Sequence, residues 1–216
     1  FILHGNGPLL NRGCEAILRT TIQIIDHHWH GCRFIYSPFG KYSTPDREQF
    51  RHPRLVHRPP VEGWRSSAWF RQQWNGRVRG FERFAFEPYL KEAKGALALG
   101  GDNFSLDYNV PTPQFEALAL ARQAGVPTVV WGASVVPFSS QPELEKDYAE
   151  KLSHVALICA RETYTLKYLN GLGLVDNVRL VSDPAFVLEP EAYALDQTIE
   201  EALGSGCIGI NLSPIM

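Results

Sequence analysis

The stretch Ala-Leu-Ala-Leu-Gly-Gly-Asp-Asn (residues 96–103) opens the part of the sequence that decides the fold. Its first four residues are apolar throughout, as expected of a strand that is buried on both faces of a parallel sheet. A helical pattern over Pro113–Ala124 follows, ends at Gly125, and leads into a second apolar run, Thr128–Trp131. A helix that stops at a glycine between two buried strands predicts a right-handed strand–helix–strand unit.

The same alternation of short apolar runs and longer helical patterns continues on both sides of this unit. The remaining strand candidates are Phe1–His4, Arg33–Ser37, Leu55–His57, Ala156–Cys159, Val178–Val181 and Cys207–Leu212. The remaining helical patterns are Glu15–His28, Glu143–His154 and Thr163–Leu169. This rhythm predicts an α/β fold, with a Rossmann-like, doubly wound and mostly parallel sheet over residues 1–190.

Composition excludes several functional classes. The 216 residues include 21 Lys and Arg against 23 Asp and Glu, so the formal net charge is −2. With 44% hydrophobic residues, the chain is too apolar for a disordered protein. The charge balance argues against a protein that holds nucleic acid by bulk positive charge. No apolar run approaches the roughly 20 residues that a membrane-spanning helix needs.

The cysteines bear on the cellular compartment. The four residues are Cys14, Cys32, Cys159 and Cys207. Their wide spacing fits neither a disulfide framework nor a zinc site, and therefore favours free thiols in a reducing compartment. We therefore expect a cytoplasmic protein, and the inner membrane surface is a further option for its location. The chain opens inside an apolar run, so a signal peptide also stays an option. No metal is expected, because the histidine cluster at residues 27–30 has no further ligands nearby.

Residues 41–92 interrupt the alternation with many arginines and aromatic residues. We expect a helical insertion there, outside the basic scaffold of the sheet. One interpretation is a solvated arginine face over an aromatic packing face. The other is a basic, aromatic surface for an anionic acceptor or for membrane headgroups, which would give at most peripheral membrane contact. RNA binding is less favoured because the rest of the chain is acidic.

Ligands bind such sheets at the carboxyl ends of the strands, so the residues that follow each strand are the candidate sites. Asn11, Arg12, Gly13 and Glu15 follow the first strand and open the first helix. This loop suits a phosphate or carboxylate, although it matches neither the dinucleotide-binding nor the Walker pattern. The alternative is a structural turn, in which Glu15 complements the helix dipole.

A second candidate loop follows Leu99 and consists of Gly100, Gly101, Asp102 and Asn103. The two glycines would let the backbone approach a ligand closely. The carboxylate and the amide would then direct hydrogen bonds to hydroxyl groups, as a sugar ring requires. The alternative is a tight turn in which Asp or Asn caps a helix.

Three further motifs lie at strand ends. Ser134 lacks the surroundings of a hydrolase nucleophile, so we treat it as a substrate-binding residue. Arg161 opens a helix, where its guanidinium would clamp a carboxylate or phosphate in a bidentate manner. The alternative for Arg161 is a structural ion pair with Glu162. Asp183, which precedes Pro184, favours a turn or an interdomain corner.

Taken in order, these motifs resemble the polysaccharide pyruvyl transferase family. The matching pieces are Gly5, Asn11–Ile17, Leu99–Asn103, Gly132–Ser134 with Pro137 and Phe138, Arg161–Thr163, Ser182–Ala185 and Ile208–Pro214. The resemblance spans nearly the whole chain, and the ordered series of short motifs gives it specificity. It implies the N-terminal half of a GT-B-like pair of facing domains. Residues 191–216 would then form a linker and the start of a second domain.

The resemblance also implies an activity and roles for individual residues. A pyruvyl ketal would pass from phosphoenolpyruvate, the donor substrate, to two hydroxyls of a cell-surface sugar or its lipid-linked precursor, with no cofactor. Arg161 would clamp the donor, Asp102 and Asn103 would orient the sugar, and the loop at residues 11–15 would line the cleft. The general acid would come from the second domain, so the 216-residue fragment alone is expected to be inactive.

One departure and two rival functions accompany this resemblance. The family usually has Arg-Asp where this chain has Arg161-Glu162. The first rival is a nucleotide-sugar glycosyltransferase of the same two-domain architecture. The second is a non-catalytic, sugar-binding relative that kept the fold and lost the chemistry.

Overall fold

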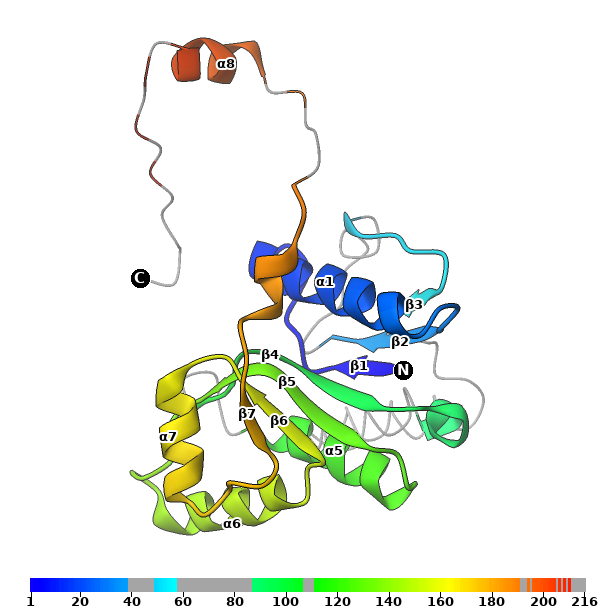
Figure 1. Ribbon diagram of the computed structural model, residues 1–216, viewed down its shortest axis with the longest axis vertical. Helices are drawn as coiled ribbons and strands as arrows, with labels where there is room; N and C mark the ends of the chain where they lie inside the picture. Colours follow the sequence, from blue (N-terminus) through cyan, green and yellow to red (C-terminus); the bar gives the residue numbers. More distant parts are fainter. Residues whose placement is uncertain are drawn as a thin grey trace, which may run out of the picture.

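In the computed structural model, seven strands of the described residues form a single parallel sheet (Figure 1). The structure describes residues 1–38, 49–57, 87–106, 111–190 and 196–204, together with positions 194, 206, 208 and 210. The sheet order is β3-β2-β1-β4-β5-β6-β7, and every neighbouring pair is parallel. The strands are β1 (Ile2–His4), β2 (Phe34–Ser37), β3 (Leu55–His57), β4 (Ala96–Phe104), β5 (Thr128–Val135), β6 (Leu157–Ala160) and β7 (Val178–Leu180).

Helices cover both faces of this sheet, which confirms the predicted doubly wound, Rossmann-like fold. The α-helices are α1 (Arg12–His28), α5 (Thr112–Gln123), α6 (Pro142–Ser153), α7 (Thr163–Gly171) and α8 (Gln197–Gly204). The described residues also form two short 3₁₀ helices, η1 (Glu87–Glu92) and η2 (Pro184–Val187). In the described part of the chain, no helix has the length and apolar character needed to cross a membrane.

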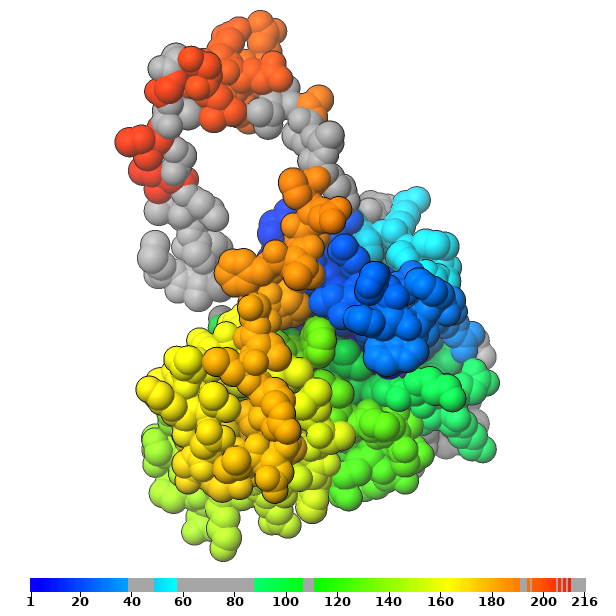
Figure 2. All heavy atoms as spheres, viewed as in Figure 1, coloured from blue at the N-terminus to red at the C-terminus, as the bar shows by residue number. Residues whose placement is uncertain are grey.

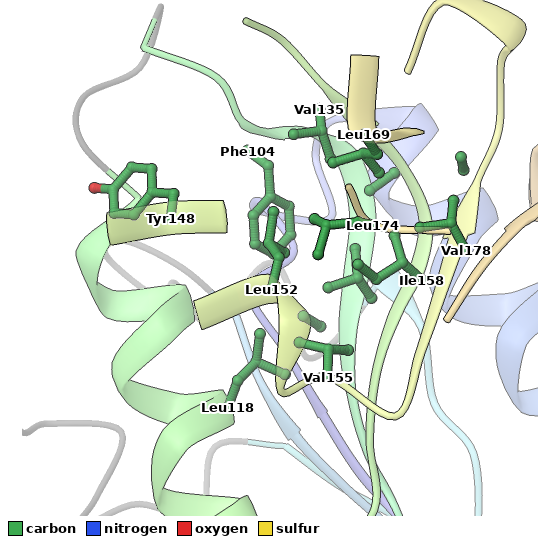
Figure 3. Close-up of a cluster of buried hydrophobic side chains, with 14 of the residues drawn as sticks. Phe104, Leu118, Val135, Tyr148, Leu152, Val155, Ile158, Leu169, Leu174 and Val178 are labelled. Atoms are coloured by element: carbon green, nitrogen blue, oxygen red, sulfur yellow. The ribbon is translucent and has the colours of Figure 1, made fainter. Parts of the chain in front are cut away.

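Alternate residues of β4 bury themselves against opposite layers. Leu97 and Leu99 pack in a cluster with the apolar face of α1, whereas Ala98 packs in a cluster that contains residues of α5, α6 and α7. Figure 3 shows this second cluster, to which β4 contributes Phe104, α5 Leu118, α6 Tyr148 and β6 Ile158. Burial on both faces explains why the strands read as continuous apolar runs.

Two strands continue further than the sequence predicts. Residues 100–103 belong to β4, so the loop predicted there is wrong, and Gly132–Ser134 belong to β5, whose predicted end was Trp131. The apolar pattern stops at Leu99 because glycine offers no side chain to bury, but the backbone pairing of β4 with β5 continues to Phe104 and Val135. An irregular register between Gly101 and Phe104 marks this extension.

The expected insertion and the expected last strand are described only in part. Within residues 41–92, the structure describes 49–57, which contain the edge strand β3, and 87–92, which form η1. The rest of that segment lies outside the described residues. Of the strand expected at 207–212, the two described residues, Ile208 and Ile210, are exposed and outside any regular element.

After β7, the chain turns back across the carboxyl edge of the sheet. Figure 2 shows these residues running from β7 toward the N-terminal residues of α1. The 3₁₀ helix η2 packs beside α1, with Ala185 against the apolar cluster of that helix. The turn at Asp183 and Pro184 therefore lies where β4, β5 and α1 meet, and this position makes it part of the site described next.

Candidate active site at the carboxyl edge of the sheet

The sheet order reverses direction between β1 and β4, since the chain runs outward from β1 through β2 and β3 and then returns to β4. Open α/β sheets bind their ligands at the carboxyl ends of strands beside such a switch point. All the predicted site residues lie at this edge, after or within the ends of four adjacent strands, β1, β4, β5 and β6. The structure therefore places the separate sequence motifs along one edge.

Arg161, the predicted donor clamp, is held by two neighbours. Its Nε donates a hydrogen bond to Ser134 Oγ at 2.8 Å, and its Nη1 donates to Asp183 Oδ2 at 2.7 Å. The side chain stays 26% exposed, and none of the described residues binds its Nη2 group. An anchored guanidinium with free N–H groups is able to bind a carboxylate or a phosphate.

The alternative ion pair between Arg161 and Glu162 does not form. Glu162 instead accepts a hydrogen bond from Thr165 Oγ1 at 3.0 Å, within the first turn of α7. The acidic partner of Arg161 is Asp183, which lies 22 positions further along the chain. The sequence predicts only a turn or an interdomain corner at Asp183, because nothing in the local pattern indicates a contact across two strand ends.

Asp183 also begins η2. Its Oδ1 accepts a hydrogen bond from the Ala185 amide at 2.9 Å, so the residue is the N-cap of that helix. Pro184 then packs against Gly132, where a β-carbon would lie 2.4 Å from Pro184 Cδ. Gly132 has a φ of +61°, and a β-carbon on Gly100 would lie 2.0 Å from the Gly132 carbonyl oxygen. Gly132 is therefore required by the close Pro184 ring and Gly100 by the close backbone of Gly132, and at these two positions no ligand need be invoked.

The loop before α1 is held mainly by its own side chains. Asn11 is the N-cap of α1, and its Oδ1 accepts hydrogen bonds from the amides of Gly13 at 3.0 Å and Cys14 at 3.4 Å. This cap takes two of the amides that were candidates for binding an anion. It also explains why α1 begins at Arg12, three residues before the predicted start.

Glu15 ties this helix to the segment at 49–57. It is 8% exposed and accepts hydrogen bonds from Arg12 and Arg19, both at 2.7 Å, and from Gln49 at 3.1 Å. Burial alone would raise the pKa of Glu15, but the hydrogen bonds from Arg12 and Arg19 outweigh it and hold the pKa below its ordinary value. Glu15 is thus a structural anchor, while the Arg12 side chain, 73% exposed, stays accessible to an anion.

The end of β4 presents one fixed amide and one exposed carboxylate. Asn103 Nδ2 donates to the carbonyl oxygens of Leu99 at 3.1 Å and Gly100 at 2.9 Å, which fixes the irregular strand end. Asp102 is exposed and lies close to the first turn of α1. There, burial raises the pKa of the Cys14 thiol and the negative charge of Asp102 adds to the rise. Asp102 is therefore the exposed polar side chain at the end of β4.

His4 ends β1 beside these residues and is 1% exposed. Burial lowers the pKa of His4 to about 4, so the imidazole is neutral at physiological pH. In the described part of the chain, no group of three or more His, Cys, Asp or Glu side chains has the arrangement of a metal site.

The fold and this edge of polar side chains define an α/β protein with a candidate ligand-binding site at the switch point. A model of the polysaccharide pyruvyl transferase family matches residues 11–210. The chain therefore belongs to the polysaccharide pyruvyl transferase family, a family of transferases that act in polysaccharide biosynthesis. No curated protein and no solved structure matches it. All ten predicted site residues fall inside the matched range.

Proposed function

We propose that the protein transfers a pyruvyl ketal from phosphoenolpyruvate to a sugar of a cell-surface polysaccharide or of its lipid-linked precursor. The observation that carries this proposal is the Arg161 guanidinium, which is anchored at the edge of the sheet and has an Nη2 group that none of the described residues binds. Membership of the family supports the reaction class. The donor carries a carboxylate and a phosphate, which are the groups that such a guanidinium binds best.

The reaction requires a proton and two sugar hydroxyls. A general acid adds a proton to the methylene carbon of phosphoenolpyruvate, which becomes a methyl group and leaves positive charge on the adjacent carbon. One hydroxyl oxygen attacks that carbon and loses its proton. The bond to the phosphate oxygen then breaks, and a second hydroxyl oxygen attacks with loss of its proton. Inorganic phosphate and the ketal are the products.

At the sheet edge, cationic side chains bind the donor and an anionic side chain binds the sugar. Arg161 holds the donor through directed hydrogen bonds, since its own charge is largely balanced by Asp183. Arg12 supplies a second, exposed cation at the same edge. Asp102 accepts hydrogen bonds from the sugar and orients it. His4 is buried and neutral, so we assign the general acid to another residue.

A thermal-shift panel tests the proposal on the complete protein. A ligand at about 100 times its dissociation constant adds about 2.7 kcal/mol to the free energy of unfolding, which such a scan detects. Phosphoenolpyruvate is expected to raise the melting temperature, and nucleotide-sugars are expected to leave it unchanged. Stabilisation by a nucleotide-sugar alone would identify a glycosyltransferase instead.

A pair of arginine variants locates the effect. Arg161→Ala should lose the response to phosphoenolpyruvate, because the donor contact is removed. Arg122→Ala removes an exposed arginine from the last turn of α5, beside the amino end of β5, and should keep the response. An unchanged response in Arg161→Ala would contradict the assigned role.

A further inference from the structure

We infer that Asp183 is a positioning residue for Arg161, which it holds in the orientation that binds the donor. The inference rests on the proposed function for its catalytic consequence and on the contacts of Arg161 for its physical basis. Asp183 Oδ2 accepts from Arg161 Nη1 at 2.7 Å, and both side chains are largely buried, at 26% and 20% exposed. From the sequence alone, Asp183 is expected only at a turn or an interdomain corner.

The two carboxylate oxygens of Asp183 perform separate tasks. Oδ2 holds the guanidinium, whereas Oδ1 caps η2 through the Ala185 amide at 2.9 Å. The first contact concerns the site and the second concerns local folding. A substitution that keeps one contact and removes the other therefore separates the positioning role from the structural role.

Ser134 completes the support from the opposite side. Its hydroxyl accepts from Arg161 Nε at 2.8 Å, so the guanidinium is fixed at two of its three nitrogens. Two fixed points set the plane of the group, whereas one would leave it free to rotate. Orientation of this kind matters because a displacement of about 1 Å at a reacting group costs up to ~100-fold in rate.

The position of Asp183 is itself fixed by the backbone around it. Pro184 packs against Gly132 of β5, and Ala185 packs against the apolar cluster of α1. The carboxylate thus reaches Arg161 from a turn that is anchored to two other elements. This rigid support is what a positioning residue requires.

Asp183→Ser is the decisive variant. Serine is a good N-cap and keeps the contact to the Ala185 amide, but it is too short to hold Arg161. Asp196→Ser is the matched control, because Asp196 caps α8 through the Thr198 amide at 2.9 Å and contacts no residue of the site. Both variants should melt within a few degrees of the wild-type protein.

The first readout is the chemical reactivity of Arg161, which depends on neither substrate nor turnover. Phenylglyoxal attacks guanidinium nitrogens that are free of hydrogen bonds, and peptide mass spectrometry reports its rate at each arginine. Arg161 should react faster in Asp183→Ser than in the wild-type protein, and at the wild-type rate in Asp196→Ser. An equal rate in all three proteins would overturn the inference.

The second readout is steady-state kinetics with phosphoenolpyruvate. Asp183→Ser should raise KM or lower kcat so that kcat/KM falls at least ~10-fold, within the range that misplacement causes. In an Arg161→Ala background, the same substitution should cost nothing further, because a positioning residue acts only through its partner. Additive losses would show a merely structural role.

These readouts distinguish the proposed pyruvyl transfer from the positioning of Arg161 by Asp183. Faster modification of Arg161 together with no pyruvyl transfer by the wild-type protein would contradict the proposed function and leave the positioning contact intact. Should Asp183→Ser melt much earlier than the control, Ser134→Ala provides the same test from the other side of the guanidinium. It should also speed modification of Arg161.

Discussion

Pro184 lies so close to Gly132 that a β-carbon on the glycine would be 2.4 Å from Pro184 Cδ and 3.0 Å from Pro184 Cγ. Gly132 belongs to β5 and Pro184 to the turn after β7, so their contact packs that turn against the end of the sheet. Because Asp183 precedes Pro184, the position of the carboxylate that holds Arg161 depends on the absence of a side chain at Gly132.

Gly132→Ala should therefore destabilise the protein by about 2–5 kcal/mol. The left-handed φ of +61° costs about 1–2 kcal/mol for alanine, and the clash with Pro184 adds about 1–3 kcal/mol of overpacking. Urea unfolding at neutral pH measures the loss. Gly173→Ala is the control, because Gly173 has a φ of +84° with open space around it. That variant should lose only the about 1–2 kcal/mol that the left-handed φ costs. Equal losses at the two positions would contradict the packing argument.

Arg161→Ala should lower turnover with phosphoenolpyruvate at least ~100-fold, provided the guanidinium contacts charge in the transition state. Arg161→Lys should recover only part of the activity, because an ammonium group cannot reproduce both the contact with Ser134 and the contact with Asp183. Phosphate release in the presence of an acceptor measures the rate. Activity in Arg161→Ala that matches the Arg122→Ala control would remove Arg161 from the mechanism.

Glu15→Gln should cost about 2 kcal/mol of unfolding free energy, since it weakens hydrogen bonds from two arginines to a largely buried carboxylate. The pKa of Glu15 is lowered in the folded state. Its stabilisation is therefore present above the ordinary pKa of glutamate and is lost as the pH falls through the folded pKa. Urea unfolding between pH 6 and pH 3 should show that the free energy of unfolding falls less in Glu15→Gln than in the wild-type protein. Glu92→Gln breaks only an exposed ion pair with Arg33 and should cost at most about 0.5 kcal/mol.

His4 should make the protein less stable as the pH falls from about 6.5 to about 4. Burial lowers its folded pKa to about 4, so in that interval the unfolded chain binds a proton that the folded chain does not. The loss amounts to about 3 kcal/mol, at 1.36 kcal/mol for each pH unit between the two values. His4→Gln, which does not titrate, should flatten this part of the stability curve. A curve of unchanged slope in that variant would show that other groups govern the interval.

The strand positions were predictable because burial on both faces leaves continuous apolar runs, as in residues 96–99 and 128–131. The strand ends were not predictable, because Gly100 and Gly132 carry no apolar side chain, although β4 and β5 remain paired beyond them. Helix α1 was predicted three residues short for a related reason. Its first turn is polar and is defined by the Asn11 cap rather than by periodicity.

The candidate site was predictable as a set of strand ends but not as a set of contacts. Arg161 and Ser134 were both expected at this edge, and their strands, β5 and β6, are neighbours. Asp183 was missed because its contact with Arg161 depends on how the chain turns after β7, which no local pattern encodes. Asn11 and Glu15 were predicted as ligand-binding residues, and the structure shows them engaged with their own helix and with Gln49.

The central place of β1 in the sheet affects how the protein is made. Ile2 pairs with Ile35 on one side and with Ala96 on the other. One edge of this strand therefore stays unpaired until its partner, 94 positions further along the chain, has been synthesised. At ribosomal speeds of roughly 5–20 residues per second, that wait lasts roughly 5–20 s. During synthesis, the nascent chain therefore carries an unpaired, apolar strand edge that offers a binding site to chaperones and a risk of aggregation.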